Sequence, residues 1–192
     1  VSLVVAPPGE SANYLALAAA PPGMNMEAPI VSPEQASQKI SPELAAVLWA
    51  APLPDGAAAE AMRRFLVSGG HVCFFAPGKS SGATFNNLGW SQTTIAPAGK
   101  FFILKEWDRS DGPLRDGLDG SPVAAQRVKA LRRQIPEGDA TTLARWEDGE
   151  PAFVRRIVDH GTAWLLGTVP DYSWSNLGDA DALLPLVQRI VS

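Results

Sequence analysis

The feature that most constrains the fold is an alternation of short apolar runs with helix-forming segments in the first half of the chain. Most of the apolar runs end in proline or glycine, as buried strands do; they are Ser2–Ala6, Pro29–Val31, Leu44–Ala51 and His71–Ala76. The clearest helix follows Asp55, gathers Ala58, Ala61, Met62, Phe65 and Leu66 on one face and ends at Gly69-Gly70. This order predicts a parallel sheet with right-handed crossovers.

Cap residues indicate where the other helices begin. Ser11 is expected to cap a short helix that ends before Pro21-Pro22-Gly23. Ser32-Pro33-Glu34-Gln35 has the pattern of a capping box with proline at the first helical position. Asp179 is expected to cap a final helix, with Pro185 in its first turns, where proline is tolerated best.

The second half of the chain has a different pattern. Residues 79–99 are rich in Ser, Gly, Asn and Thr and predict a long loop. Strands are expected, with tight turns at Asp148-Gly149 and His160-Gly161, over Phe101–Trp107, Arg127–Gln134, Thr142–Trp146, Ala152–Val158 and Thr162–Gly167. The prediction is an α/β fold, mostly parallel, with antiparallel strands added at one edge in the C-terminal half. A single domain is expected over residues 1–192.

Composition excludes some classes of partner and structure. The formal net charge is −4, so there is no basic excess to bind phosphate, and nucleic acid is not an expected partner. The single cysteine cannot form an internal disulfide. The sequence begins at Val1 inside a strand-like run, which indicates a piece of a larger protein whose targeting or membrane segments are not included.

Three stretches in order resemble a known family. They are an apolar strand with its proline-rich turn, a helix followed by Gly-Gly and a strand, and a strand end followed by Asp-x-x-Trp-x-Asn-Leu and a helix, at Leu44–Asp55, Met62–Gly78 and Gly167–Leu186. This resembles the class I glutamine-amidotransferase-like domain of bacterial membrane proteins similar to the aerotolerance-regulator group, which often carry a von Willebrand factor A region. The resemblance implies a flavodoxin-like three-layer sandwich, flanking membrane helices, and a membrane-anchored, periplasmic location.

The residues that an amidotransferase needs are missing. The nucleophile should be a cysteine on a sharp strand-to-helix elbow, assisted by a histidine. Cys73 lies inside the run HVCFFA, His71 shares its face of the strand, and His160 falls in a turn. The family's elbow position, near Ala76, offers no nucleophile, and Pro170-Asp171-Tyr172 stands where the family has His-x-Glu. The expectation is a non-catalytic domain without metal or cofactor.

Two strand ends form a candidate ligand crevice, because open α/β sheets bind ligands beyond the carboxyl ends of their strands. The candidate residues are Pro77, Gly78, Ser80, Ser81, Asp171, Trp174 and Asn176. The alternative is structural: Trp174 would fill the sheet edge, while Asp171 and Asn176 cap turns.

Two other features have simpler interpretations. The aspartates of the loop at 108–119 lack the order of a calcium loop, which favours a solvated turn region. Trp90, within the predicted loop, could be an exposed anchor for a partner.

Three functions are compatible with these patterns. The first is a non-catalytic protein-interaction or sensing module in a membrane-anchored assembly, whose partner is a protein or another domain of the same chain. In this hypothesis any membrane contact is made through flanking segments. The second is a small-ligand or carbohydrate-binding domain that uses the carboxyl ends of the parallel strands. The third is a hydrolase with an unrecognised carboxylate pair.

Overall fold

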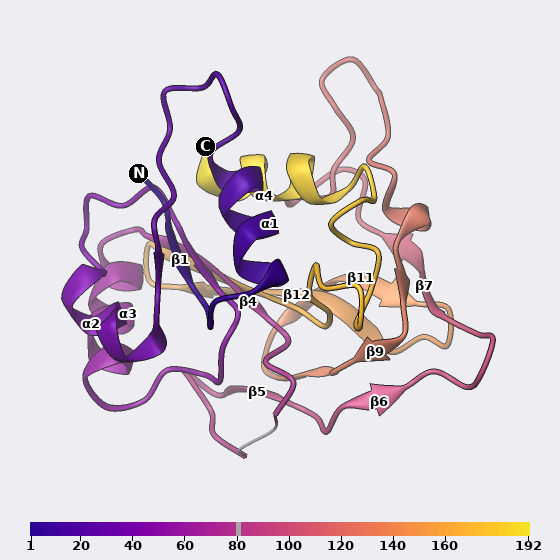
Figure 1. The fold of residues 1–192 in the computed structure, drawn as a ribbon, viewed down its shortest axis with the longest axis horizontal. Helices are drawn as coiled ribbons and strands as arrows, with labels where there is room; N and C mark the ends of the chain where they lie inside the picture. The colour runs from indigo at the N-terminus through magenta and orange to yellow at the C-terminus, as the bar shows by residue number, and fades with distance from the viewer. Residues whose placement is uncertain (80–81) are drawn as a thin grey trace.

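A computed structural model describes residues 1–79 and 82–192 (Figure 1). Across these residues, nine strands form one sheet in the order β2-β1-β3-β4-β13-β12-β11-β7-β8. Their bounds are β1 Leu3–Val5, β2 Ile30–Val31, β3 Val47–Trp49, β4 His71–Phe75, β7 Phe102–Trp107, β8 Lys129–Ala130, β11 Thr141–Trp146, β12 Pro151–Val158 and β13 Gly161–Leu166. The expected α/β fold with one large mixed sheet is therefore confirmed.

The first five strands of that order are parallel. β1 lies between β2 and β3, and β4 lies between β3 and β13, with Leu48 beside Cys73 and Cys73 beside Trp164. The predicted strands thus pair in parallel, and their carboxyl ends meet at one edge. That edge carries the candidate site.

The last strands of the order are antiparallel. β12 pairs with both β13 and β11, β7 pairs with β11, and β8 completes the edge. The predicted antiparallel extension is therefore confirmed, with β13 joining the two halves.

Two predictions for this half are wrong in detail. The predicted strand Arg127–Gln134 is divided into the 3₁₀ turn η2 (Ala125–Arg127), β8 and β9 (Arg132–Arg133). The predicted loop contains β5 (Leu88–Trp90), which pairs with β10 (Pro136–Gly138), and β6 (Thr94–Ile95), which pairs with β9. Polar composition concealed these short strands because their partners lie some 40 residues away in the sequence. Trp90 lies in β5 and is buried, so its predicted role as an exposed anchor is wrong.

Helices cover both faces of the parallel strands (Figure 1). α1 (Glu10–Ala19) packs against α4 (Leu183–Val191) on one face, and α2 (Ala36–Lys39) packs against α3 (Gly56–Val67) on the other. Successive side chains of β4 alternate between the two cores: Cys73 and Phe75 join the α1–α4 side, while Val72 and Phe74 join Met62 and Phe65 of α3. The parallel strands are therefore buried on both faces, which explains their continuous apolar runs.

The helix ends follow some of the predicted caps. The capping box is confirmed before η1 (Pro33–Gln35), where the Ser32 N–H donates to Gln35 Oε1 at 3.4 Å. Asp55 is the residue before α3, but its side chain makes no cap hydrogen bond. Two predicted caps are wrong: α1 begins after Gly9 rather than Ser11, and α4 begins after Ala182 rather than Asp179. The Asp179 carboxylate instead accepts hydrogen bonds from two tyrosines.

Candidate ligand pocket at the carboxyl edge of the sheet

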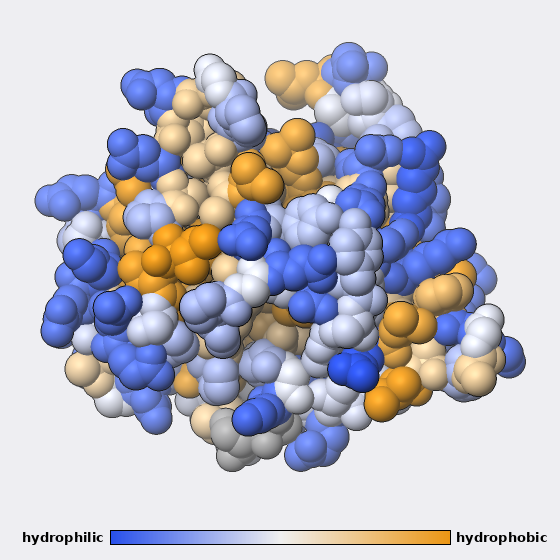
Figure 2. Space-filling view, in the orientation of Figure 1, coloured by the Kyte–Doolittle hydropathy of each residue, from blue (hydrophilic) through white to orange (hydrophobic). Residues whose placement is uncertain are grey.

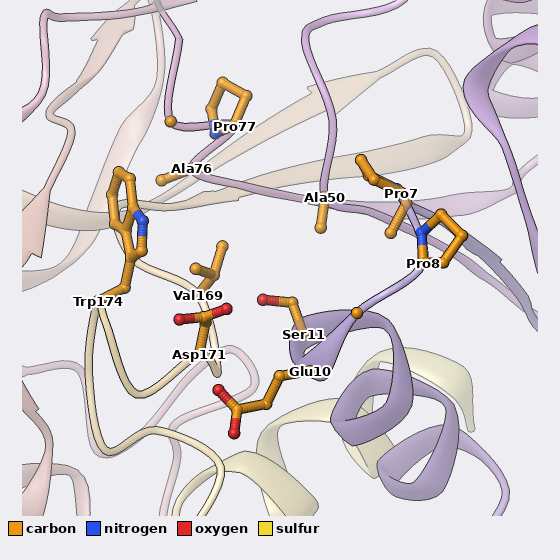
Figure 3. A pocket seen from close by; sticks show the side chains of 13 residues that line it. Pro7, Pro8, Glu10, Ser11, Ala50, Ala76, Pro77, Val169, Asp171 and Trp174 are labelled. Carbon is orange, nitrogen blue, oxygen red and sulfur yellow. The ribbon is translucent and has the colours of Figure 1, made fainter.

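The segments that follow β1, β3, β4 and β13 converge on a cavity of about 200 Å³ (Figure 3). Its lining consists of Ala6, Pro7, Pro8, Gly9, Glu10, Ser11, Ala50, Ala76, Pro77, Gly78, Val169, Asp171 and Trp174. Each contributing strand is parallel to the others, so these segments leave the sheet at the same edge. The cavity lies where open α/β sheets commonly bind ligands.

Trp174 forms one wall of this pocket, across from the Pro7-Pro8 segment (Figure 3). The indole packs on Gly78, where a β-carbon would lie 3.4 Å from Trp174 Cζ2. Gly78 also has a positive φ of 81°, a backbone angle that favours glycine. The wall therefore combines an aromatic face with a backbone turn that other residues would disturb.

Hydrogen bonds with Gln134 and Thr93 hold the turn at Gly78. The buried side chain of Gln134 accepts a hydrogen bond from the Gly78 N–H at 2.9 Å and donates to Ser91 O at 3.0 Å. Thr93 Oγ1 donates to Gly78 O at 3.1 Å. Both backbone groups of Gly78 are thus paired with distant residues, which fixes the turn without help from a ligand.

The polar groups of the pocket gather on one side, where Figure 3 shows the Glu10 and Asp171 carboxylates and the Ser11 hydroxyl. One oxygen of Glu10 accepts from the Tyr172 N–H at 2.8 Å. Asp171 Oδ1 accepts from the Ser173 N–H at 2.8 Å and from its hydroxyl at 2.5 Å. Each carboxylate therefore has one oxygen fixed by the protein and a second oxygen that can accept hydrogen bonds.

The start of α1 adds backbone donors. The first intrahelical bond runs from the Asn13 N–H to Gly9 O, at 3.2 Å, so the helix itself does not use the three preceding N–H groups. Glu10 and Ser11 carry two of these groups and also line the pocket. The residues at the start of α1 thus bring both backbone donors and side-chain acceptors to the pocket wall.

The structure brings together part of the predicted site. Pro77, Gly78, Asp171 and Trp174 line the cavity. Asn176 does not: its Oδ1 accepts from the Lys129 N–H at 2.8 Å and its Nδ2 donates to Arg127 O at 2.9 Å. Ser80 and Ser81 lie outside the described residues. For Asn176 the structural alternative holds, because both ends of its amide group are bonded to backbone.

Sequence reasoning missed the α1 side of the pocket. Glu10 and Ser11 were overlooked, although they follow the Pro7-Pro8-Gly9 turn that ends the first apolar run. The signal was available, because the carboxyl end of every parallel strand faces the same edge. The predicted site includes the ends of β4 and β13, which contribute three lining residues each, whereas the segment after β1 contributes six.

Cys73 and both histidines are remote from this chemistry. Cys73 is fully buried in mid-strand, and desolvation raises the pKa of its thiol well above the usual range. His71 begins β4, four residues before the strand's pocket end, which corresponds to roughly 13 Å along the strand. The His160 backbone lies beside Gly69, at that same far edge. Among residues 1–79 and 82–192, no cluster of three or more His, Cys, Asp or Glu is arranged to hold a metal ion.

The aspartate loop at 108–119 is held by hydrogen bonds within the loop and by an ion pair with Arg155 of β12. Asp108 Oδ1 accepts from Ser110, and Asp111 pairs with Arg155 at 2.7 Å. Hydrogen bonds from Ser110 and Arg155 lower the pKa of Asp108 and Asp111, respectively. The expectation of a turn-rich loop agrees with these contacts.

Solved structures of similar fold include glycosidases and bacterial cytoplasmic proteins. A β-galactosidase from Bacillus circulans sp. alkalophilus matches with a TM-score of 0.65 at 15% identity, over 98% of this chain and 30% of that one. One from the haloarchaeon Halorubrum lacusprofundi matches with a TM-score of 0.61 at 15% identity, over 100% and 30%. A cytoplasmic protein of Salmonella typhimurium LT2 matches with a TM-score of 0.64 at 10% identity, over 100% and 98%. No protein-family model and no curated protein matches the sequence.

These comparisons correct the family expectation. The similar structures include β-galactosidases and cytoplasmic proteins, and no family model matches, so the predicted membership of the glutamine-amidotransferase-like and von Willebrand factor A group is wrong. The motifs behind it have a more general cause: Asp171, Trp174 and Asn176 fix a strand-to-helix loop, which many α/β sheets require. At these identities the likeness shows the fold alone.

The prediction of a membrane-anchored, periplasmic interaction or sensing module depended on that family and is also wrong. No helix in the described part of the chain is long and apolar enough to cross a bilayer. Two of the solved structures, each matched over 98% of its length, are named as cytoplasmic proteins of Salmonella. The extent of the domain and its protein partners stay predictions.

Proposed function

We propose that this domain binds a neutral polyhydroxylated ligand, a saccharide, in the pocket formed beyond β1, β3, β4 and β13. The observation that carries the proposal is the meeting of two carboxylates, Glu10 and Asp171, with the ring of Trp174 around one small cavity. Carboxylate oxygens accept strong hydrogen bonds from hydroxyl groups. An indole face offers an apolar surface to the C–H groups of a sugar ring. The pocket therefore provides for both sides of a saccharide.

The charge of the pocket argues against an anionic ligand. Its described lining contains Glu10 and Asp171 but no lysine, arginine or histidine. The α1 amides would attract an anion, but two like charges in the same cavity oppose it. A ligand rich in hydroxyl groups can donate to the carboxylates and accept from the amides at the same time. A neutral polyol satisfies more of these groups than a phosphate or carboxylate would.

We also propose that the parallel half is flavodoxin-like. Renumbered along the chain, β2-β1-β3-β4-β13 reads 2-1-3-4-5, the order of that doubly wound sheet, and helices cover both faces. In such a sheet the chain reverses its winding direction between β1 and β3, and ligands bind at that point. The segments after these two strands both line the pocket, which supports this location.

The comparisons make a saccharide the first ligand to test. Two of the similar structures are β-galactosidases, enzymes named for a saccharide substrate. The chain spans 30% of the length of each, so the activity of those whole proteins is not carried over. The names of these enzymes support only the class of ligand, a saccharide.

We further propose that the domain binds without catalysing turnover or using a cofactor. Among the described residues that line the pocket, Ser11 carries the one hydroxyl side chain, and both histidines lie at the other edge of the sheet. A serine without a nearby base is a weak nucleophile. The Glu10 and Asp171 pair could in principle serve hydrolysis, so the test includes that reaction.

Isothermal titration with methyl β-galactoside, lactose and other neutral saccharides tests the proposal. The wild-type protein should bind at least one of them. Glu10→Gln, which keeps the shape but removes the charge, should weaken that binding about tenfold, the loss typical of a charge-assisted hydrogen bond. The matched control is Asp139→Asn, an exposed acid that pairs with Arg156 at 3.3 Å and does not line the pocket.

Two results would contradict this account. One is the absence of binding heat with every saccharide at millimolar concentration; the other is equal affinity in wild type and Glu10→Gln. If the protein released nitrophenol from nitrophenyl β-galactoside and Glu10→Gln abolished that release, the function would be hydrolysis rather than binding alone.

A further inference from the structure

A group of polar side chains outside the pocket joins α1 to the loop at 168–179. It consists of Tyr14, Tyr172 and Asp179, here called the tyrosine–aspartate cluster. Tyr14 donates to Asp179 Oδ1 at 3.1 Å, Tyr172 donates to Asp179 Oδ2, and the two hydroxyl oxygens are 2.9 Å apart. The cluster thus connects residues 158 and 165 positions apart in the sequence.

Packing of the rings makes the cluster specific. The Tyr14 and Tyr172 rings meet edge to face, with centroids 6.2 Å apart and planes at 82°. Gly178 lies against the Tyr14 ring, where a β-carbon would come within 2.8 Å. Tyr172 is nevertheless 51% exposed, and exposed polar contacts contribute little to stability. The geometry that the cluster imposes is therefore its main consequence.

The cluster is connected to the pocket through Tyr172. The Tyr172 N–H donates to Glu10 at 2.8 Å, and Tyr172 directly follows Asp171. Glu10 and Tyr14 are one helical turn apart on α1, so they lie on the same side of the helix. Tyr172 therefore contacts α1 twice, with its backbone N–H at Glu10 and its side chain at Tyr14. It is also the chain neighbour of Asp171, the second carboxylate of the pocket.

The opposite side of the loop is fixed by other contacts. The Leu131 N–H donates to Trp174 O at 2.7 Å, and Ser175 Oγ donates to Val169 O at 2.6 Å. These bonds hold Trp174 whatever happens at α1. α1 is held in the core by packing against α4, and the cluster adds the contacts that hold the side of α1 bearing Glu10 and Tyr14 against the loop.

We propose that Tyr14, Tyr172 and Asp179 are positioning residues for the saccharide pocket, which hold α1 against the loop so that Glu10 stands at a fixed distance from Asp171. This inference rests on the proposed function. Because the three side chains do not line the pocket, their effect on ligand affinity passes through Glu10.

A double-mutant cycle on methyl β-galactoside binding tests the inference. Tyr172→Phe, Tyr14→Phe and Asp179→Asn keep the side-chain shapes and should each raise Kd about five- to tenfold, a loss expected for one misplaced hydrogen bond. In the Glu10→Gln protein, Tyr172→Phe should add less than about a twofold change, because coupled residues are not additive. A purely structural role would instead lower the unfolding temperature and leave the Kd of the folded protein unchanged.

The control for Asp179→Asn is Glu60→Gln, which removes another exposed, hydrogen-bonded carboxylate, paired with Arg63 at 2.6 Å on α3. Its Kd should equal that of the wild type. Wild-type Kd values in all three cluster variants, or a full additional loss from Tyr172→Phe in the Glu10→Gln protein, would overturn the positioning role. Absence of wild-type binding would overturn the proposed function itself, and this inference with it.

Discussion

Glu10 and Asp171 are carboxylates from opposite ends of the chain that share one small cavity. Each is anchored by a backbone N–H donor, from Tyr172 and Ser173 respectively. Each donor occupies one carboxylate oxygen and leaves the other oxygen's lone pairs for a ligand. At the scale of residues, the pocket is a set of acceptors already held in place, which lowers the entropy lost on binding.

Tyr172 gives a residue-scale prediction. Its hydrogen bond to Asp179, assisted by Tyr14, raises the pKa of the Tyr172 hydroxyl above the ordinary value of 10.0. A raised folded-state pKa means that this contribution to stability is complete below the unfolded pKa and is lost as pH rises through the folded one. The chain has two tyrosines, so an absorbance titration at alkaline pH should resolve a late-ionising residue.

Two variants identify that residue. Tyr172→Phe should remove the late step, and Asp179→Asn should move it toward the ordinary range. A late step that persists in Tyr172→Phe would assign it elsewhere and contradict the hydrogen-bond geometry.

At the scale of elements, β13 joins the parallel and antiparallel halves. It lies between β4, to which it is parallel, and β12, to which it is antiparallel. Its first residue, Gly161, lies tightly against the turn between α3 and β4: a β-carbon there would lie 2.3 Å from Leu66 O and 2.5 Å from Gly70 O. These neighbours are backbone atoms, so they cannot move aside cheaply.

Gly161→Ala should therefore destabilise the protein by about 1–3 kcal/mol, the usual cost of overpacking. Chemical denaturation measures this free energy. Gly89→Ala in β5 is the control, because its β-carbon would meet its nearest neighbour at an ordinary 3.6 Å. Equal stability of the two variants would show that the start of β13 is less constrained than described.

Some elements were predictable from local sequence and others were not. The runs at β1, β3 and β4 were found because strands buried on both faces are continuously apolar. β5 and β6 were missed because their pairing partners lie far along the chain. Asp179 is of a residue type that often caps helices, but its carboxylate instead accepts hydrogen bonds from Tyr14 and Tyr172. Glu10 has no distinctive local pattern, and only the parallel arrangement of the strands places it at the same edge as the ends of β4 and β13.

At the scale of the whole molecule, the parallel half carries the candidate pocket and the antiparallel half supports it. Gln134, from the segment before β10, holds the Gly78 turn, and Arg127 and Lys129 hold the loop that bears Trp174. The two halves therefore meet at the site. A ligand that orders the parallel half is therefore expected to order the antiparallel half as well.

The exposed apolar side chains are distributed over the surface. Figure 2 shows several apolar patches separated by polar side chains on the face seen there. Leu17 of α1 and Leu184 of α4 line one hollow, whereas Ile95 of β6 and Ile157 of β12 are exposed on other elements. This pattern on the face shown differs from the single broad apolar surface that marks large permanent interfaces.

The central claim is that a saccharide binds beside Trp174. The most direct measurement is the indole N–H spectrum of the protein during titration with the saccharide, because six tryptophans give six separable signals. Trp174→Phe assigns its own signal by loss. The account predicts that the Trp174 signal shifts most, while that of Trp107, on β7 in the antiparallel half, stays in place. An unmoved Trp174 signal at saturating saccharide, or a larger shift at Trp107, would contradict it.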